Sequence, residues 1–118
     1  MTSRDLRMYI LVNSDIKINK GKLAGQVGHA VAAYIYHSSD LRFLMSIEEY
    51  MSGSHKKIIL GCPQKDLEML EKDGFITIRD NGLTDLEPNT LTCVNMGIFD
   101  FNGESRYLDY IKGLPLLR

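Results

Sequence analysis

Short apolar runs alternate with amphipathic segments along this chain. Residues 8–12 (MYILV) form a continuous apolar run, the pattern of a strand that is buried on both faces. Residues 57–62 (KIILGC), 75–79 (FITIR) and 91–98 (LTCVNMGI) carry similar runs, and each is bounded by turn-forming residues. The pattern therefore predicts four strands.

Apolar positions at helical spacing predict four helices between and after these strands. The predicted segments are 21–36, 38–51 and 63–74, and a last helix that begins near Gly103 or Glu104. Ser39 or Asp40 is the expected cap of the second helix. Pro63 near the start and Gly74 past the end delimit the third helix.

The resulting order, β-α-α-β-α-β-β-α, is typical of an α/β fold. Strands that are separated by helices favour parallel pairing through right-handed crossovers. A loop alone, residues 80–90, joins the last two strands, so an antiparallel or an irregular pair is expected there. We predict a mixed four-stranded sheet with helices on both faces, in a single domain over residues 1–118.

Composition and net charge limit which partners and which cellular location we expect for this protein. The 118 residues are 44% hydrophobic and 25% charged, which is ordinary for a globular protein. The net charge of -1 means that a nucleic-acid partner would have to be bound by a local basic patch. No run approaches the ~20 apolar residues of a membrane span, and the apolar run at residues 8–12 is too short for a signal peptide. We expect a cytoplasmic protein with no membrane contact.

The cysteines and histidines suggest no metal chemistry. Cys62 and Cys93 are far apart and form no C-x-x-C motif, so they are expected to be reduced, buried thiols. His29, His37 and His55 are not placed at ligand spacing. These residues therefore predict no zinc site.

The first predicted helix carries polar residues on a narrow stripe. Because a helix turns by about 100° per residue, Lys22, Gln26 and His29 share one side. The same wheel puts a core stripe at Leu23, Val27, Ala30 and Tyr34, and a small-residue face at Ala24, Gly25, Gly28 and Ala32. The two interior glycines cost about 1 kcal/mol each relative to alanine, and close packing is the expected compensation. The stripe alone fits either a site or solvated polar residues with a hydrogen-bonded histidine.

A second polar cluster follows the third predicted strand. Asp80 comes directly after that strand, and ligands of open α/β sheets bind at the carboxyl ends of strands. Nearby hydroxyls and carboxylates are supplied by Thr84, Asp85, Glu87, Thr90 and Thr92. The segment Asp80-Asn81-Gly82 is also strong turn chemistry, so a plain hydrogen-bonded turn remains the alternative. No P-loop, G-x-S-x-G or G-x-G-x-x-G motif is present.

Taken together, the segments DIKINKGKLAGQVGHA (residues 15–30) and DNGLTDLEPNTLT (residues 80–92) resemble the motifs of the peptidyl-tRNA hydrolases of the archaeal and eukaryotic type. The order of the segments between and after them is also similar, down to the LPLL tail at residues 114–117. The resemblance implies a mixed four-stranded sheet, frequent dimers, and cleavage of the ester that joins a peptide to the 3′ ribose of tRNA, without metal or cofactor. It therefore implies tRNA as a partner and a homodimer as the assembly.

The resemblance also implies roles for individual residues. The family's catalytic lysine, aspartate and threonine fall on Lys22, Asp80 and Thr84. Its substrate-binding positions fall on Lys17, Lys20, Gln26, His29 and Thr92, and Arg79 is a further expected phosphate contact. In ester hydrolysis, Asp80 with Thr84 would orient the water, and Lys22 would stabilise the oxyanion or the leaving oxygen. An ion pair between Lys22 and Asp80 would hold both groups in place.

Several positions depart from the family pattern. Leu83 stands where the family carries arginine or lysine, and Asp85 where it carries glutamine. These changes remove a cation and add an anion, which should weaken the binding of a polyanion. Asn19 and Asn89 each replace a glycine of the pattern. Two alternatives therefore stay open, a non-catalytic binding or adaptor module and a hydrolase of another ester or amide.

Overall fold

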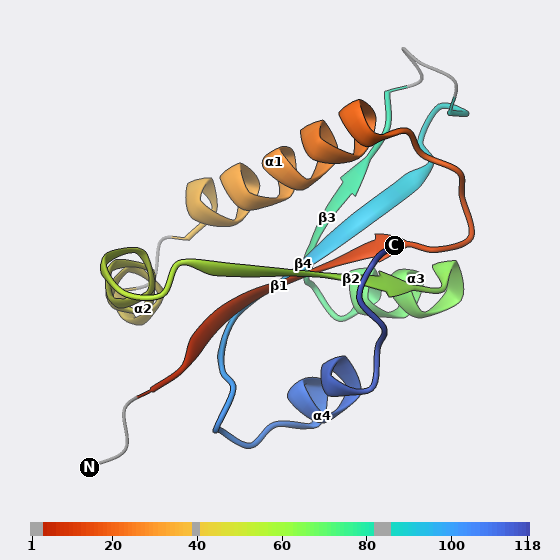
Figure 1. The fold of residues 1–118 in the computed structure, drawn as a ribbon. Helices are drawn as coiled ribbons and strands as arrows, with labels where there is room; N and C mark the ends of the chain where they lie inside the picture. Colours follow the sequence, from red (N-terminus) through yellow and green to blue (C-terminus); the bar gives the residue numbers. More distant parts are fainter. Residues whose placement is uncertain (1–3, 39–40, 82–85) are drawn as a thin grey trace.

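A mixed four-stranded sheet lies at the centre of the computed structural model, which describes residues 4–38, 41–81 and 86–118 (Figure 1). The strands are β1 (Leu6–Asn13), β2 (Lys56–Cys62), β3 (Ile76–Arg79) and β4 (Leu91–Asp100). Their spatial order is β2-β1-β4-β3. β1 pairs parallel with β2, and β4 pairs antiparallel with both β1 and β3. Three strands therefore run in one direction, and β4 lies between two of them in the opposite direction.

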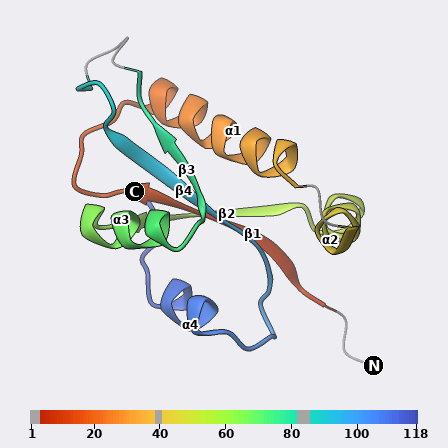
Figure 2. The ribbon, with the colours of Figure 1, turned by 180° about the vertical axis from the view of Figure 1, so that it is seen from behind.

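In the described part of the chain, four helices cover the two faces of this sheet: α1 (Lys20–Tyr36), α2 (Leu41–Ser52), α3 (Gln64–Lys72) and α4 (Arg106–Lys112). Because successive side chains of a strand point to opposite faces, β1 supplies both halves of the core. Met8, Ile10 and Val12 pack with residues of α1 and α2, whereas Tyr9 and Leu11 pack with residues of α3 and α4. Figure 1 and Figure 2 show α1 over one face and α3 and α4 over the other.

The predicted fold class and element order are confirmed. β3 and β4, whose connecting loop left the pairing open, are antiparallel neighbours. β2 and β3, which a helix separates, run in the same direction but lie at different edges of the sheet. The expected caps of α2, Ser39 and Asp40, lie outside the described residues.

The predicted start of the last helix at Gly103 or Glu104 is wrong by two to three residues. A turn closes there first, because the Gly103 amide donates to the Asp100 carbonyl at 2.9 Å. The helix begins at Arg106, after Ser105, whose side chain accepts from the Tyr107 amide at 3.2 Å. The N-terminal cap is thus a serine, a residue type strongly preferred at that position.

The predicted close packing around the glycines of α1 is also wrong. A methyl group at Gly25 or Gly28 would meet no atom within 4 Å among the described residues, apart from nearby backbone of the same helix. Gly97 shows the contrasting case, with a φ of +93° and a Tyr34 ring atom 3.0 Å from where its methyl group would lie. Glycine is therefore required at Gly97 for steric reasons, and the fold within this chain does not require it in α1.

The tail of the chain covers part of one sheet edge. The Gly61 amide of β2 donates to the Pro115 carbonyl at 2.9 Å, and the Leu117 amide donates to the Ile59 carbonyl at 3.0 Å. These bonds satisfy outward-facing backbone groups of an edge strand. None of the helices in the described ranges is long and apolar enough to cross a membrane.

Candidate active site

Lys22 and Asp80 form an ion pair at one end of the sheet, with 2.5 Å between Nζ and Oδ1. The two residues are 58 positions apart in the sequence. The Asp80 side chain is 2% exposed and the Lys22 side chain is 16% exposed. A carboxylate this deeply buried is strongly destabilising without charged or hydrogen-bonded partners, so the ammonium group is an integral part of the local fold.

The helix start places Lys22. Asn19 is the N-terminal cap of α1, and its side chain accepts a hydrogen bond from the Lys22 amide at 2.8 Å. The Asn19 carbonyl accepts from the Leu23 amide at 2.9 Å, which closes the first turn. The positive end of the helix dipole adds to the positive charge of Lys22 in this first turn.

Backbone hydrogen bonds to Asn89 and Thr90 fix the position of Asp80 at the end of β3. The Asp80 amide donates to the Thr90 carbonyl at 2.9 Å, and the Asn89 amide donates to the Asp80 carbonyl at 2.7 Å. Asn89 has a φ of +65°, a left-handed conformation that asparagine tolerates better than most residues with a side chain. This conformation explains why asparagine can stand where the family pattern has glycine.

Gln26 and Thr92 join α1 to β4 one helical turn after Lys22. The Thr92 Oγ1 lies 2.8 Å from Gln26 Oε1 and 3.0 Å from the Ile78 carbonyl oxygen. A hydroxyl group has one proton, so both contacts are satisfied only if the Gln26 amide turns its NH2 group toward Thr92. Both side chains are buried, which fixes the distance between the helix and the sheet behind the ion pair.

The buried thiols take no part in this chemistry. Burial raises the pKa of Cys93, which lies next to Thr92, to about 11. Burial likewise raises the pKa of Cys62. Both groups are therefore protonated at neutral pH, and a protonated thiol is a poor nucleophile. Within the described residues, no group of three or more histidines, cysteines and carboxylates is placed to hold a metal ion.

The other predicted site residues lie farther from the ion pair. Lys17 and Lys20 are exposed on the loop before α1 and at its first residue. His29 is exposed on the same side of α1 as Lys22, seven residues farther along. Thr84, together with the departures Leu83 and Asp85, lies outside the described residues.

Arg79 is less available than the sequence suggested. Its Nε and one terminal nitrogen donate to Glu71 at 3.2 and 2.7 Å, and the other terminal nitrogen donates to the Asn89 carbonyl at 2.7 Å. Glu71 therefore offsets the charge of Arg79, and the guanidinium is tied by its hydrogen bond to Asn89 in the loop between β3 and β4. The role of Asn19 as the cap of α1 was not predicted, although an asparagine just before a predicted helix is an N-cap signal.

The fold and the site define an α/β protein that holds a buried carboxylate against a lysine at the start of its first helix. Such a pair can orient a water molecule and stabilise a developing negative charge. A family model described as "Peptidyl-tRNA hydrolase PTH2" matches residues 6–100. The chain therefore belongs to the peptidyl-tRNA hydrolase PTH2 family, which confirms the resemblance of its two motifs.

Relatives named peptidyl-tRNA hydrolase match over most of the chain. The protein from Staphylothermus marinus is 36% identical over 119 residues, which are 96% of this chain and 95% of the relative. The protein from Methanopyrus kandleri is 33% identical over 120 residues, covering 95% of this chain and 98% of the relative. A third relative, from Saccharolobus solfataricus, is 36% identical over 103 residues, which are 78% of this chain and 85% of the relative.

Proposed function

We propose that this protein hydrolyses the ester bond between a peptide and the 3′ ribose of tRNA. The family and the names of the relatives support this activity. The observation that carries it here is the 2.5 Å contact between Lys22 and Asp80, the expected catalytic lysine and aspartate, one from each family motif. The alternative of a non-catalytic adaptor gains no support from the comparisons, because the relatives carry the enzyme's name.

In this proposal Asp80 orients the attacking water. Its carboxylate accepts a hydrogen bond from the water, directly or through Thr84, while the water oxygen attacks the ester carbonyl carbon. The bond from that carbon to the ribose oxygen then breaks, one proton of the water ends on the ribose oxygen, and the other is released to solvent from the new carboxylic acid. The products are a peptide with a free carboxylate and a tRNA with a free terminal hydroxyl.

Lys22 is the proposed electrostatic partner. Its ammonium group, beside the N-terminus of α1, would stabilise the oxyanion of the tetrahedral intermediate or the leaving ribose oxygen. Asp80 holds this ammonium group in place before substrate binds, so little reorganisation is required during the reaction. These two groups supply a water-orienting acceptor and a positive charge, so we propose a reaction without metal or cofactor.

We further propose that Lys17 and Lys20 contact the phosphates of the tRNA. Both are exposed next to the ion pair in sequence, whereas the charge of Arg79 is offset by Glu71. The affinity for tRNA should fall steeply with salt concentration, because each neutralised phosphate releases counterions. A shallow dependence on salt would argue against an RNA substrate.

The test is turnover of a purified peptidyl-tRNA, measured beside a simple N-acetyl aminoacyl ester. Wild type should hydrolyse the peptidyl-tRNA, and Lys22→Ala and Asp80→Asn should each lose at least about a hundredfold in rate. Met69→Ala, a change of an exposed residue on α3, is the control. Turnover of the simple ester alone would indicate a hydrolase of another substrate, and tRNA binding without turnover would indicate an adaptor.

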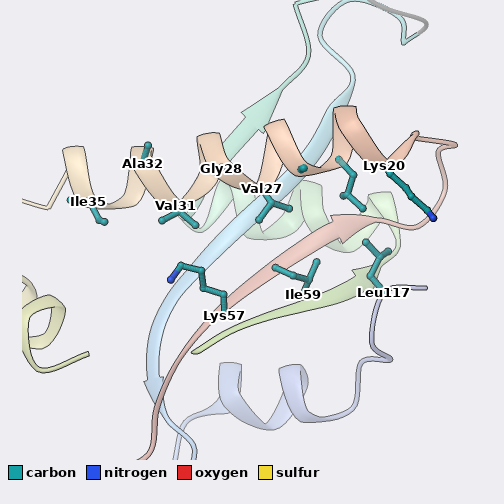
Figure 3. A pocket seen from close by; sticks show the side chains of 11 residues that line it. Lys20, Val27, Gly28, Val31, Ala32, Ile35, Lys57, Ile59 and Leu117 are labelled. Carbon is teal, nitrogen blue, oxygen red and sulfur yellow. The ribbon is translucent and has the colours of Figure 1, made fainter. Parts of the chain in front are cut away.

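A homodimer in the cytoplasm, where translation supplies the substrate, completes the proposal. An apolar groove of about 880 Å³ runs along the β2 side of α1 and supports a second copy as its occupant. Figure 3 shows Val27 and Val31 of α1 across this groove from Ile59 and Leu117. In sedimentation equilibrium, wild type should be a dimer and Val31→Glu should be a monomer. Met69→Glu, on α3, should remain a dimer. A monomeric wild type would contradict the dimer but not the activity.

A further inference from the structure

A second groove lies on the opposite side of α1, between this helix and β3. Its volume is about 530 Å³, and we call it the β3 groove. Polar and aromatic residues line much of it, among them His29, Tyr36, His37, Thr77, Arg79 and Asn81. Figure 1 and Figure 2 both show α1 alongside β3, the edge strand of the sheet.

The β3 groove lies close to the ion pair, although neither Lys22 nor Asp80 lines it. Arg79 and Asn81 flank Asp80 in the sequence, and both line the groove. His29 and Tyr36 follow Lys22 on one side of α1, because seven residues make nearly two full turns. At about 1.5 Å per residue, His29 lies about 10 Å and Tyr36 about 21 Å along the helix from Lys22. A ligand in the groove would therefore point one end at the ion pair.

The length of the β3 groove suits a short single strand of nucleic acid, and its lining adds no negative charge that would repel one. Stacked nucleotides advance by about 3.4 Å each, so the stretch from Lys22 to Tyr36 can accommodate the few unpaired nucleotides at the 3′ end of a tRNA. None of the described residues that line the groove is acidic. The nearby carboxylate of Glu71 is paired with Arg79 at 2.7 Å.

Tyr36 provides a surface on which a base can stack. Its side chain is 77% exposed at the last residue of α1. The His37 ring packs against it edge to face, with 5.1 Å between ring centroids and an angle of 69° between ring planes. Exposed aromatic rings of this kind bind unpaired bases, which stack on them with little regard to sequence. The groove on the β2 side of α1 is instead lined mainly by aliphatic side chains.

We propose that the β3 groove binds the unpaired 3′ nucleotides of tRNA, with a base stacked on Tyr36 and the terminal ribose directed at Lys22 and Asp80. The proposal rests on the proposed function, because it requires that the ester at the 3′ ribose reach this ion pair. Arg79 and Asn81 line the groove on the β3 side. His29 faces the nucleotides between the ion pair and Tyr36.

The test uses two unacylated RNA hairpins with the same stem, one with an unpaired 3′-ACCA end and one blunt. Fluorescence anisotropy at low salt should show that wild type binds the hairpin with the unpaired end about tenfold more tightly, as expected for one stacked base. Tyr36→Ala should lose this preference, and Tyr36→Phe should keep it because the ring remains. Met69→Ala, at a residue that is 64% exposed on α3, should also keep it.

A second readout reports stacking directly. A 2-aminopurine placed in the unpaired end should be quenched on binding to wild type and to Tyr36→Phe, and not on binding to Tyr36→Ala. If wild type shows no preference for the unpaired end, or Tyr36→Ala keeps the full preference, the proposal is wrong. Turnover of peptidyl-tRNA by wild type, measured in parallel, separates the two claims. If wild type hydrolyses peptidyl-tRNA but does not prefer the unpaired 3′ end, only the proposal for the β3 groove is wrong. If wild type prefers the unpaired end but does not hydrolyse peptidyl-tRNA, only the proposed function is wrong.

Discussion

Neutralising Lys22 alone should destabilise this protein more than neutralising Lys22 and Asp80 together. The Asp80 carboxylate is 2% exposed, so Lys22→Met leaves a buried negative charge without its ammonium partner. Breaking a buried ion pair from one side costs about 3–5 kcal/mol, and we expect a loss of about 3 kcal/mol for this variant. Since small domains are stable by about 5–15 kcal/mol, the variant should still fold.

The reverse single change should cost less. Asp80→Asn leaves the ammonium group of Lys22, which is 16% exposed and can turn toward water. We expect a loss of about 1 kcal/mol for this variant and a similar loss for the double variant, in which no buried charge remains. The coupling energy of the double-mutant cycle is then about 3 kcal/mol, well above the range for independent sites.

Urea unfolding followed by far-UV circular dichroism gives the stability of wild type, the two single variants and the double variant. The slope of the free energy of unfolding against urea concentration should be the same in all four, so that differences in midpoint report differences in stability. The exposed pair of Arg4 and Glu49, 3.0 Å apart, is the matched control, and its cycle should give a coupling close to zero. If the losses of the Lys22 and Asp80 variants simply add, the buried ion pair does not exist in solution.

Activity should not follow stability in this cycle. The double variant restores most of the stability that Lys22→Met loses, but it contains neither the carboxylate nor the ammonium group. We expect turnover of peptidyl-tRNA to stay at least about a hundredfold below wild type in all three variants. Recovery of turnover in the double variant would mean that the pair only supports the fold.

Three further predictions concern the surroundings of the site. Gly25→Ala should raise the free energy of unfolding by up to about 1 kcal/mol, because a methyl group there meets nothing within 4 Å; a lower urea midpoint would contradict this. Asn19→Ala should lower the free energy of unfolding by about 1 kcal/mol, because the Lys22 amide loses its cap. Asn19→Asp should keep the wild-type free energy of unfolding in the same urea assay. Burial raises the pKa of Cys93 from 9.0 to about 11, so the unfolded thiol loses its proton first. Stability should therefore fall as the pH rises from about 9 to about 11, and urea midpoints across this range should fall less in Cys93→Ala.

The arrangement of the fold was predictable because each element carries a strong local signal. The apolar run at residues 8–12 became the central strand β1, buried on both faces. Segment order then limited the topology to a mixed sheet. The start of the last helix was missed because a turn at Gly103 precedes the serine cap at Ser105, and boundaries depend on which of several capping residues the chain uses.

The two motifs supplied the candidate site residues and the expectation that Lys22 and Asp80 pair, but not the contacts of these residues with the rest of the chain. The sequence put Lys22 at a helix start and Asp80 at a strand end, but their contact depends on β4 lying between β1 and β3. On the helical wheel Gln26 belongs to the polar stripe, so the periodicity did not predict that it is buried. Its burial follows from Thr92 on β4, a partner that helical periodicity cannot indicate. The bonds from Arg79 to Glu71 are likewise tertiary contacts.

The central claim is that Lys22 and Asp80 act together on the ester of peptidyl-tRNA. The most direct measurement is the rate at which wild type and Lys22→Ala release labelled peptide from the same peptidyl-tRNA preparation, at a temperature where both are folded by circular dichroism. We predict turnover by wild type and a loss of at least about a hundredfold in Lys22→Ala. A folded Lys22→Ala with the wild-type rate, or a wild type without turnover, would contradict the account.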